Sequence, residues 1–163
     1  MRTLQRKRFY PMWLAGLLLL SGAWAQAADF RLTDTQGRTH TLSGHKGKWV
    51  LVNYWATWCP PCLEEIPDLI ALHGDRKNNL VVIGVAMDYR SPGQVTDFAD
   101  NMLIDYPIVL GNDDIVRQIG PVGGLPTTYL YNPDGRMVAR QVGAITREMV
   151  ERYIASKTAG SKN

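Results

Sequence analysis

The chain has 163 residues, of which 45% are hydrophobic, and a formal net charge of +3, from 18 Lys and Arg against 15 Asp and Glu. Four of the basic residues and none of the acidic ones precede position 28, so the rest of the chain carries about one net negative charge and lacks the basic excess that nucleic-acid binding needs. The roughly 136 residues after position 27 suffice for one domain with its own hydrophobic core.

Residues 1–27 have the pattern of a secretory signal. The positive region at its start contains four basic residues: Arg2, Arg6, Lys7 and Arg8. A mostly apolar run over 14–25 follows, and small residues around Ala25 and Ala27 offer cleavage sites. The run is shorter than the roughly 20 residues that a spanning helix needs, so we expect cleavage, with an uncleaved membrane anchor as the alternative. Both outcomes predict a periplasmic or other extracytoplasmic location.

The first half of the remaining chain reads as a hairpin followed by a βαβ unit. Phe30–Leu42 alternates apolar and polar residues around a turn at 34–37, which predicts an N-terminal β-hairpin. The β-prone run Trp49–Trp55 predicts a strand covered on both faces. A helix is expected from Pro60 to about residue 75, because proline is tolerated in a first turn. The apolar run Leu80–Ala86 predicts a second buried strand, parallel to the first.

The second half continues with short elements. The expected elements are a helix over Pro92–Leu103, a strand over Pro107–Leu110, a helix over Asp113–Ile119, a hairpin of Thr127–Tyr131 and Arg136–Val142, and a helix over Thr146–Ser156. The predicted fold class is therefore α/β, a mixed β-sheet with helices on both faces, an N-terminal β-hairpin and a central insert. We expect one domain over 28–156, followed by a polar tail at 157–163.

Both cysteines of the chain lie in one stretch, YWATWCPPCLEEIP, at Cys59 and Cys62. A bridge between them would close a very short loop and constrain little of the unfolded chain, so it would be a weak structural staple. A zinc site would need further ligands, and no second Cys-x-x-Cys or closely spaced His pair is present. The pair therefore predicts redox chemistry.

The position of the pair suggests a role for each thiol. Cys59 stands where the strand meets the helix, and the helix N-terminus favours a negatively charged sulfur. Cys62 lies one turn inside the helix, so we expect Cys59 to be the nucleophile and Cys62 the resolving thiol. The intervening Pro60 and Pro61 add neither charge nor a hydrogen-bond donor that would stabilise the thiolate. This weakly favours a reducing over a strongly oxidising cysteine pair.

Glu65 is the acid to which helical geometry draws attention. At about 100° per residue, Glu65 lies near the apolar stripe of the helix that contains Cys62, and it follows Cys62 by about one turn. A carboxyl at the edge of an apolar face would have a raised pKa and could exchange a proton with Cys62. The alternative is that Glu65 is a first-turn acid that only stabilises the helix dipole.

Residues 50–67, VLVNYWATWCPPCLEEIP, resemble the TlpA/ResA/DsbE-like thioredoxin-fold family, which are exported thiol-disulfide oxidoreductases. The segment GLPTTYL at 124–130 resembles the second signature of that family, and the likeness spans roughly residues 30–154. Peroxiredoxins, another branch of the fold, need a threonine three residues before the reactive cysteine, where this chain has Ala56. The resemblance implies a thioredoxin-like fold and disulfide exchange with partner proteins.

The resemblance also implies roles for residues outside the cysteine pair. Pro126 matches the cis-proline that faces the disulfide, which would free the Leu125 backbone to pair with a substrate strand; a trans proline on an edge strand is the alternative. Glu65 falls where family members carry an acid. Asn53 stands where thioredoxins have a buried acid, and is either part of the proton relay or a polar core residue.

The remaining aromatic and basic side chains complete the expected site. Trp58, together with Pro60 and Pro61, is expected to line the substrate groove, while Trp49 and Trp55 belong to the core. The three histidines have no partner at ligand spacing and are expected at the surface, so we predict no metal site and no cofactor: His40, His45 and His73.

Three functions remain open. The first is an exported enzyme that reduces disulfides in partner proteins, supplied with electrons by a membrane donor; apocytochrome c and copper-site proteins are possible clients. The second is a disulfide oxidase or isomerase of the same fold. The third is a thiol-based metal carrier that holds a soft ion such as Cu(I). No nucleic-acid partner is expected.

Overall fold

The computed structural model of the chain describes residues 29–75, 77 and 79–159. The expected secretory signal at 1–27 and the end of the expected polar tail lie outside these residues. No helix within the described ranges is long and apolar enough to cross a membrane.

A five-stranded mixed sheet forms the centre of the domain, with strand order β5-β4-β3-β6-β7. Its strands are β3 (Trp49–Trp55), β4 (Leu80–Ala86), β5 (Ile108–Leu110), β6 (Thr127–Tyr131) and β7 (Met137–Val142). The first three are parallel, whereas β6 pairs antiparallel with β3, and β7 with β6. A separate antiparallel hairpin of β1 (Arg31–Thr33) and β2 (Thr39–Thr41) precedes them. The predicted α/β class and N-terminal hairpin are therefore confirmed.

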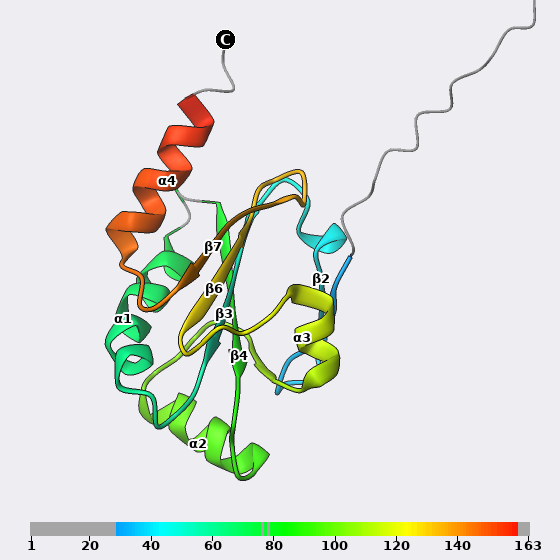
Figure 1. Cartoon of the computed structure of the whole chain (residues 1–163), viewed down its shortest axis with the longest axis vertical. Helices are drawn as coiled ribbons and strands as arrows, with labels where there is room; N and C mark the ends of the chain where they lie inside the picture. The colour runs from blue at the N-terminus through cyan, green and yellow to red at the C-terminus, as the bar shows by residue number, and fades with distance from the viewer. Residues whose placement is uncertain (1–28, 76, 78, 160–163) are drawn as a thin grey trace, which may run out of the picture.

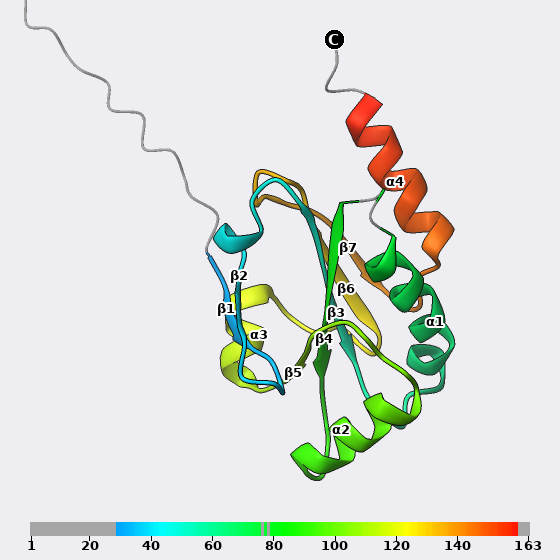
Figure 2. The same cartoon turned by 180° about the vertical axis from the view of Figure 1, so that it is seen from behind.

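Helices cover one face of the sheet, and a hairpin with a helix covers the other. The helices are α1 (Pro60–Gly74), α2 (Pro92–Asn101), α3 (Asp113–Ile119) and α4 (Arg147–Ala159), with a 3-10 turn η1 (Ser43–His45). Figures 1 and 2 show α1 and α4 side by side on one face, and α3 with the β1-β2 hairpin on the opposite face. The segment between β4 and β6 contributes α2, β5 and α3.

The side chains of β3 divide between two hydrophobic cores, which explains its continuous apolar run. Leu51 and Trp55 belong to the core under α1 and α4, which we call the α1-side core. Val52 and Tyr54 belong to the core under the hairpin and α3, because successive side chains of a strand point to opposite faces. All seven residues of β3 are buried. The predicted core positions of Trp49 and Trp55 are confirmed.

Several element ends differ from the sequence predictions. Helix α2 ends at Asn101, two residues earlier than expected, because the backbone at Leu103 turns left-handed with φ of 55°. Strands β5 and β7 each begin one residue later than expected. Helix α4 continues past Ser156 to Ala159, so the start of the expected tail is helical. The ammonium of Lys157 lies over the Tyr153 ring one turn earlier, 5.4 Å from its centroid, which favours this continuation.

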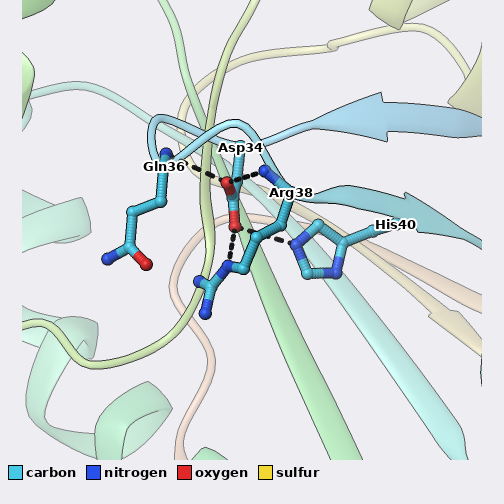
Figure 3. Close-up of polar contacts among 4 residues, drawn as sticks. All are labelled: Asp34, Gln36, Arg38 and His40. Carbon is cyan, nitrogen blue, oxygen red and sulfur yellow. Dashed lines mark hydrogen bonds and ion pairs between the residues drawn. The ribbon is translucent and has the colours of Figure 1, made fainter.

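A buried carboxylate organises the hairpin (Figure 3). Asp34 accepts hydrogen bonds from the N–H groups of Gln36 (3.0 Å) and Arg38 (2.8 Å), from Arg38 Nε (2.7 Å) and from His40 Nε2 (2.9 Å). Asp34 also forms an isolated bridge with Val109 of β5, which joins the hairpin to the main sheet. The carboxylate therefore fixes both the turn and its attachment.

The expectation that the three histidines are surface residues is wrong. All three side chains are half-buried. His40 donates to Asp34, and His73 Nδ1 accepts the N–H of Val82 at 3.2 Å. The His45 ring stacks on His40 with centroids 5.7 Å apart. Helix and strand periodicity alone could not reveal these contacts, because they depend on how the hairpin turn, η1 and the end of α1 fold back on their neighbours.

Candidate active site

The two cysteines are joined as a disulfide at the start of α1, with Cα atoms 5.3 Å apart. Cys59 is the N-cap residue in extended conformation, and its carbonyl accepts the N–H groups of Cys62 (3.0 Å) and Leu63 (3.1 Å). Pro60 and Pro61 fill the first two helical positions, where an N–H would find no partner within the helix. Cys59 is 3% exposed and Cys62 0%, so the resolving position is the more deeply covered of the two.

Trp58 forms an exposed rim beside the disulfide. It is 57% exposed, and its indole Nε1 donates to the carbonyl of Asp88 at 3.2 Å. A cavity of about 520 Å³ lies here, lined by Trp58, by three residues of the loop after β4 (Asp88, Tyr89 and Arg90) and by Gln94 of α2. Trp58, Pro60 and Pro61 are all exposed, so a docking polypeptide could reach them.

Gln94, in the first turn of α2, connects the loop after β4 to the cysteine segment. Its amide Nε2 donates to Thr57 Oγ1 at 3.0 Å, and its Oε1 accepts the N–H of Arg90 at 2.8 Å. The segment from Tyr89 to Gln94 was expected from the sequence to take part in client recognition, but neither of these contacts nor a role for Asp88 was predicted. No local motif could have found the contacts of Asp88 and of Gln94 with the cysteine segment, because they connect residues 30 and 37 positions apart in the chain.

The peptide bond between Leu125 and Pro126 is cis, as the family resemblance implied. Pro126 is buried, and its carbonyl accepts the N–H of Gly143 at 2.9 Å. Leu125 is half-buried and packs against the α1-side core, which contains both cysteines. Among the described residues, the peptide groups of Leu125 make no backbone hydrogen bond. This segment could therefore pair with an added strand.

Glu65 is a buried carboxyl bonded from two directions. Its Oε1 accepts Asn53 Nδ2 from β3 at 2.7 Å, and its Oε2 accepts the N–H of Ile145 at 2.9 Å. Asn53 Nδ2 also donates to Thr128 Oγ1 of β6 at 3.0 Å. Glu65 is 2% exposed and Asn53 0%. The structure thus brings together Glu65 and Asn53, which the sequence analysis singled out separately, and adds Thr128 and Ile145, which it missed.

Burial raises the pKa of Glu65 to about 7, because removing a carboxylate from water disfavours its charged form. The hydrogen bonds from Ile145 and Asn53 oppose this rise, and the nearby charge of Asp68 adds to it. A carboxyl that titrates near neutrality, one turn from Cys62, is suited to accept and return a proton.

Within the described ranges, no group of three or more His, Cys, Asp or Glu side chains could hold a metal ion. The Cys59–Cys62 pair, one turn from a buried carboxyl, can perform thiol–disulfide exchange with proton transfer. The sheet order, the Cys-x-x-Cys disulfide at the start of α1 and the cis-proline before β6 define a thioredoxin-like protein.

Sequence comparisons identify the family. The family model described as the AhpC/TSA family matches residues 24–140. The thiol-disulfide oxidoreductase ResA of Geobacillus kaustophilus is 38% identical over 131 residues, which cover 80% of this chain and 75% of that protein. ResA of Bacillus subtilis is 35% identical over 130 residues, covering 80% of this chain and 73% of that protein. The chain therefore belongs to the thioredoxin-like AhpC/TSA family and is similar to ResA proteins.

Solved structures agree with this assignment. A thiol:disulfide interchange protein of the thioredoxin family from Chlorobium tepidum superposes with a TM-score of 0.72 at 25% identity, over 80% of this chain and 93% of the other. A putative thioredoxin from Neisseria meningitidis gives a TM-score of 0.72 at 27% identity, over 83% and 91%. The predicted thioredoxin-like fold and the resemblance to ResA and DsbE proteins are confirmed.

Proposed function

We propose that this protein is an exported thiol-disulfide oxidoreductase that mainly reduces disulfides in partner proteins. The observation that carries the proposal is the Cys59–Cys62 disulfide at the start of α1, one turn from the buried Glu65. Two relatives named thiol-disulfide oxidoreductase ResA, at 38% and 35% identity, support the reaction class.

The proposed cycle begins with the reduced protein. The Cys59 thiolate attacks one sulfur of a client disulfide, forms a mixed disulfide, and releases the other client sulfur, which takes a proton from solvent. Cys62 then gives its proton to Glu65 and attacks the Cys59 sulfur. The Cys59–Cys62 disulfide forms, and the second client sulfur leaves and is protonated. Two electrons have passed to the client, and Glu65 returns its proton to solvent.

The other site residues act on the client or on Glu65. The exposed Trp58, Pro60 and Pro61 form one side of the client groove, and the unpaired peptide groups of Leu125 beside cis-Pro126 bond to an extended client segment. Asn53 is a positioning residue, since its amide holds the Glu65 carboxyl at 2.7 Å.

The regenerating electrons would come from a membrane donor, with apocytochrome c or copper-site proteins as candidate clients. The basic start and apolar run of residues 1–27 support export to the periplasm or an equivalent compartment, with or without an anchor.

Two measurements test the proposal. The first uses Cys62→Ser, with Cys59→Ser as the matched control, in the native compartment. We expect the first variant to accumulate mixed disulfides with its clients and the second to form none. A metal carrier would instead lose its ion in both variants and trap no partner, which would overturn the proposal.

The second measurement is the reduction potential of the cysteine pair, by equilibration in graded thiol–disulfide buffers. A value near or below about −230 mV is expected for a reductase. A value above about −150 mV would make the protein a disulfide donor, which is the oxidase or isomerase alternative.

A further inference from the structure

A second cavity, of about 250 Å³, lies between the sheet and the start of α4, away from Trp58. Leu51 of β3 and Thr128 of β6 belong to its lining, as do Ile145 and Val150 on the α4 side. Ala139 and the 41% exposed Met149 also line it. Figure 1 shows α4 on the side of the sheet where β6 and β7 lie. We call it the α4 cavity.

The α4 cavity touches both ends of the hydrogen-bond network around Glu65. Ile145, which lines it, donates its N–H to Glu65 Oε2 at 2.9 Å. Thr128, which also lines it, accepts from Asn53 Nδ2, and the same amide donates to Glu65 Oε1. Asn53 Oδ1 is buried and has no hydrogen-bond partner among the described residues, so the network retains an acceptor that a water molecule could use.

On the face that carries the disulfide, buried cysteines lie between Glu65 and solvent. Cys62, one turn before Glu65, is 0% exposed, and Cys59 is 3% exposed. The cavity beside Trp58 is lined by residues of which none bonds to Glu65, Asn53 or Thr128. A client joined to Cys59 would cover this face further.

We propose that the α4 cavity is the route by which Glu65 exchanges protons with solvent, independently of the client bound at Cys59. This inference rests on the proposed role of Glu65 as proton acceptor for Cys62. Water that enters beside Met149 reaches Thr128 and Ile145, takes the proton from the Glu65 carboxyl and carries it out as hydronium. Glu65 thereby equilibrates with bulk pH while the mixed disulfide exists.

Few charged groups face Glu65 along this route. Asp68 of α1 and the Tyr106 hydroxyl before β5 interact electrostatically with Glu65. Arg140 of β7 lines the α4 cavity, but its guanidinium donates to the Pro121 carbonyl and lies over the Tyr129 ring. None of the three bonds to the Glu65 carboxyl, so the geometry of Thr128, Asn53 and Ile145 controls access.

The test measures proton exchange at Glu65 by relaxation dispersion of its side-chain carboxyl carbon in NMR, across a pH titration of the full chain. Ala139→Leu adds bulk to the α4 cavity, and Met137→Leu is the matched control on the same strand, at a 52% exposed position outside the lining. We expect Ala139→Leu to slow exchange severalfold at an unchanged midpoint pH, and Met137→Leu to leave both unchanged. Val150→Ile repeats the test if Ala139→Leu does not fold.

A second sample carries a peptide on the face of the disulfide, so that this face is covered. Cys62→Ser is loaded at Cys59 with a synthetic peptide through an activated disulfide, and exchange at Glu65 should persist at the rate of the unloaded variant. Exchange that the peptide suppresses, or that Ala139→Leu leaves at the wild-type rate, would overturn the α4 cavity as the route. These readouts need no client turnover, so they stand apart from a failure of Cys62→Ser to trap natural partners.

Discussion

The domain buries two carboxylates on opposite sides of its sheet, and their surroundings shift their pKa values in opposite directions. Asp34, 5% exposed, lies in the turn of the β1-β2 hairpin, and Glu65, 2% exposed, lies next to the α1-side core. Burial raises the pKa of both groups. In Asp34, hydrogen bonds from His40, Arg38 and Gln36 overcome burial and bring the pKa to about 2, whereas Glu65 titrates at about 7.

Both carboxyls are almost inaccessible to solvent, but Glu65 lies deeper in the protein, and the two sites also differ in their hydrogen-bond donors. Asp34 accepts four hydrogen bonds from three residues, one of them from a guanidinium. Glu65 accepts two, both from neutral groups, and forms no ion pair within the described part of the chain. A fully paired carboxylate stays charged and serves the structure, while a carboxyl with few donors remains free to change its protonation state.

The largest expected effect is the loss of the fully paired carboxylate. Asp34→Ala leaves His40 and two backbone N–H groups without their acceptor, so we expect a loss of about 3–5 kcal/mol in the free energy of unfolding, measured by urea titration. Asp134→Ala is the control, because Asp134 pairs with Arg136 at an exposed site where the loss should stay below about 1 kcal/mol. Equal losses in the two variants would contradict the structural role of Asp34.

The raised pKa of Glu65 should make the free energy of unfolding depend on pH. Its pKa in the folded protein, about 7, exceeds the unfolded value near 4.5, so the folded state binds more protons between these values. The free energy of unfolding should therefore fall as pH rises through this window, by at most about 3 kcal/mol. In Glu65→Gln this fall should disappear. Asp34 acts with the opposite sign, since its contribution is lost as pH falls from about 4 towards 2.

The amide of Asn53 should have a smaller effect, on the pKa of Glu65. Asn53→Leu removes a donor that stabilises the charged carboxylate, so the titration midpoint of Glu65 should move up by about one pH unit in carbon NMR. Thr128→Val is the control, because it removes only the acceptor behind Asn53. A midpoint that stays near 7 in Asn53→Leu would show that Asn53 is a polar core residue without influence on Glu65.

These two carboxylates also show what could and what could not be predicted from the sequence. Glu65 could be found in advance, because its place on the apolar stripe of α1 follows from helical periodicity and its neighbour Cys62 signals chemistry. The strands β3 and β4 were predicted residue for residue, since a strand covered on both faces leaves a continuous apolar run.

Asp34 could not be found in the same way. Its turn composition predicted a hairpin, but its burial depends on contact with Val109, which is 75 positions later in the chain. Thr128 and Ile145 were missed for the same reason, because their bonds to Asn53 and Glu65 exist only after β6 and α4 pack against β3 and α1.

The smallest expected effect is that of removing the Arg38 guanidinium. It tests whether Asp34 and Glu65 differ in pKa because of a nearby charge or because of the number of hydrogen bonds. Arg38 Nε lies 2.7 Å from the Asp34 carboxylate, but the Arg38 side chain is 55% exposed, so Arg38→Gln should cost less than about 1 kcal/mol and lose that cost in high salt. Arg136→Gln, at the exposed pair with Asp134, is the control for a surface arginine. If Arg38→Gln instead cost as much as Asp34→Ala, the guanidinium would hold Asp34 in its charged form. Glu65 would then differ from Asp34 mainly because, within the described residues, no cation bonds to its carboxyl.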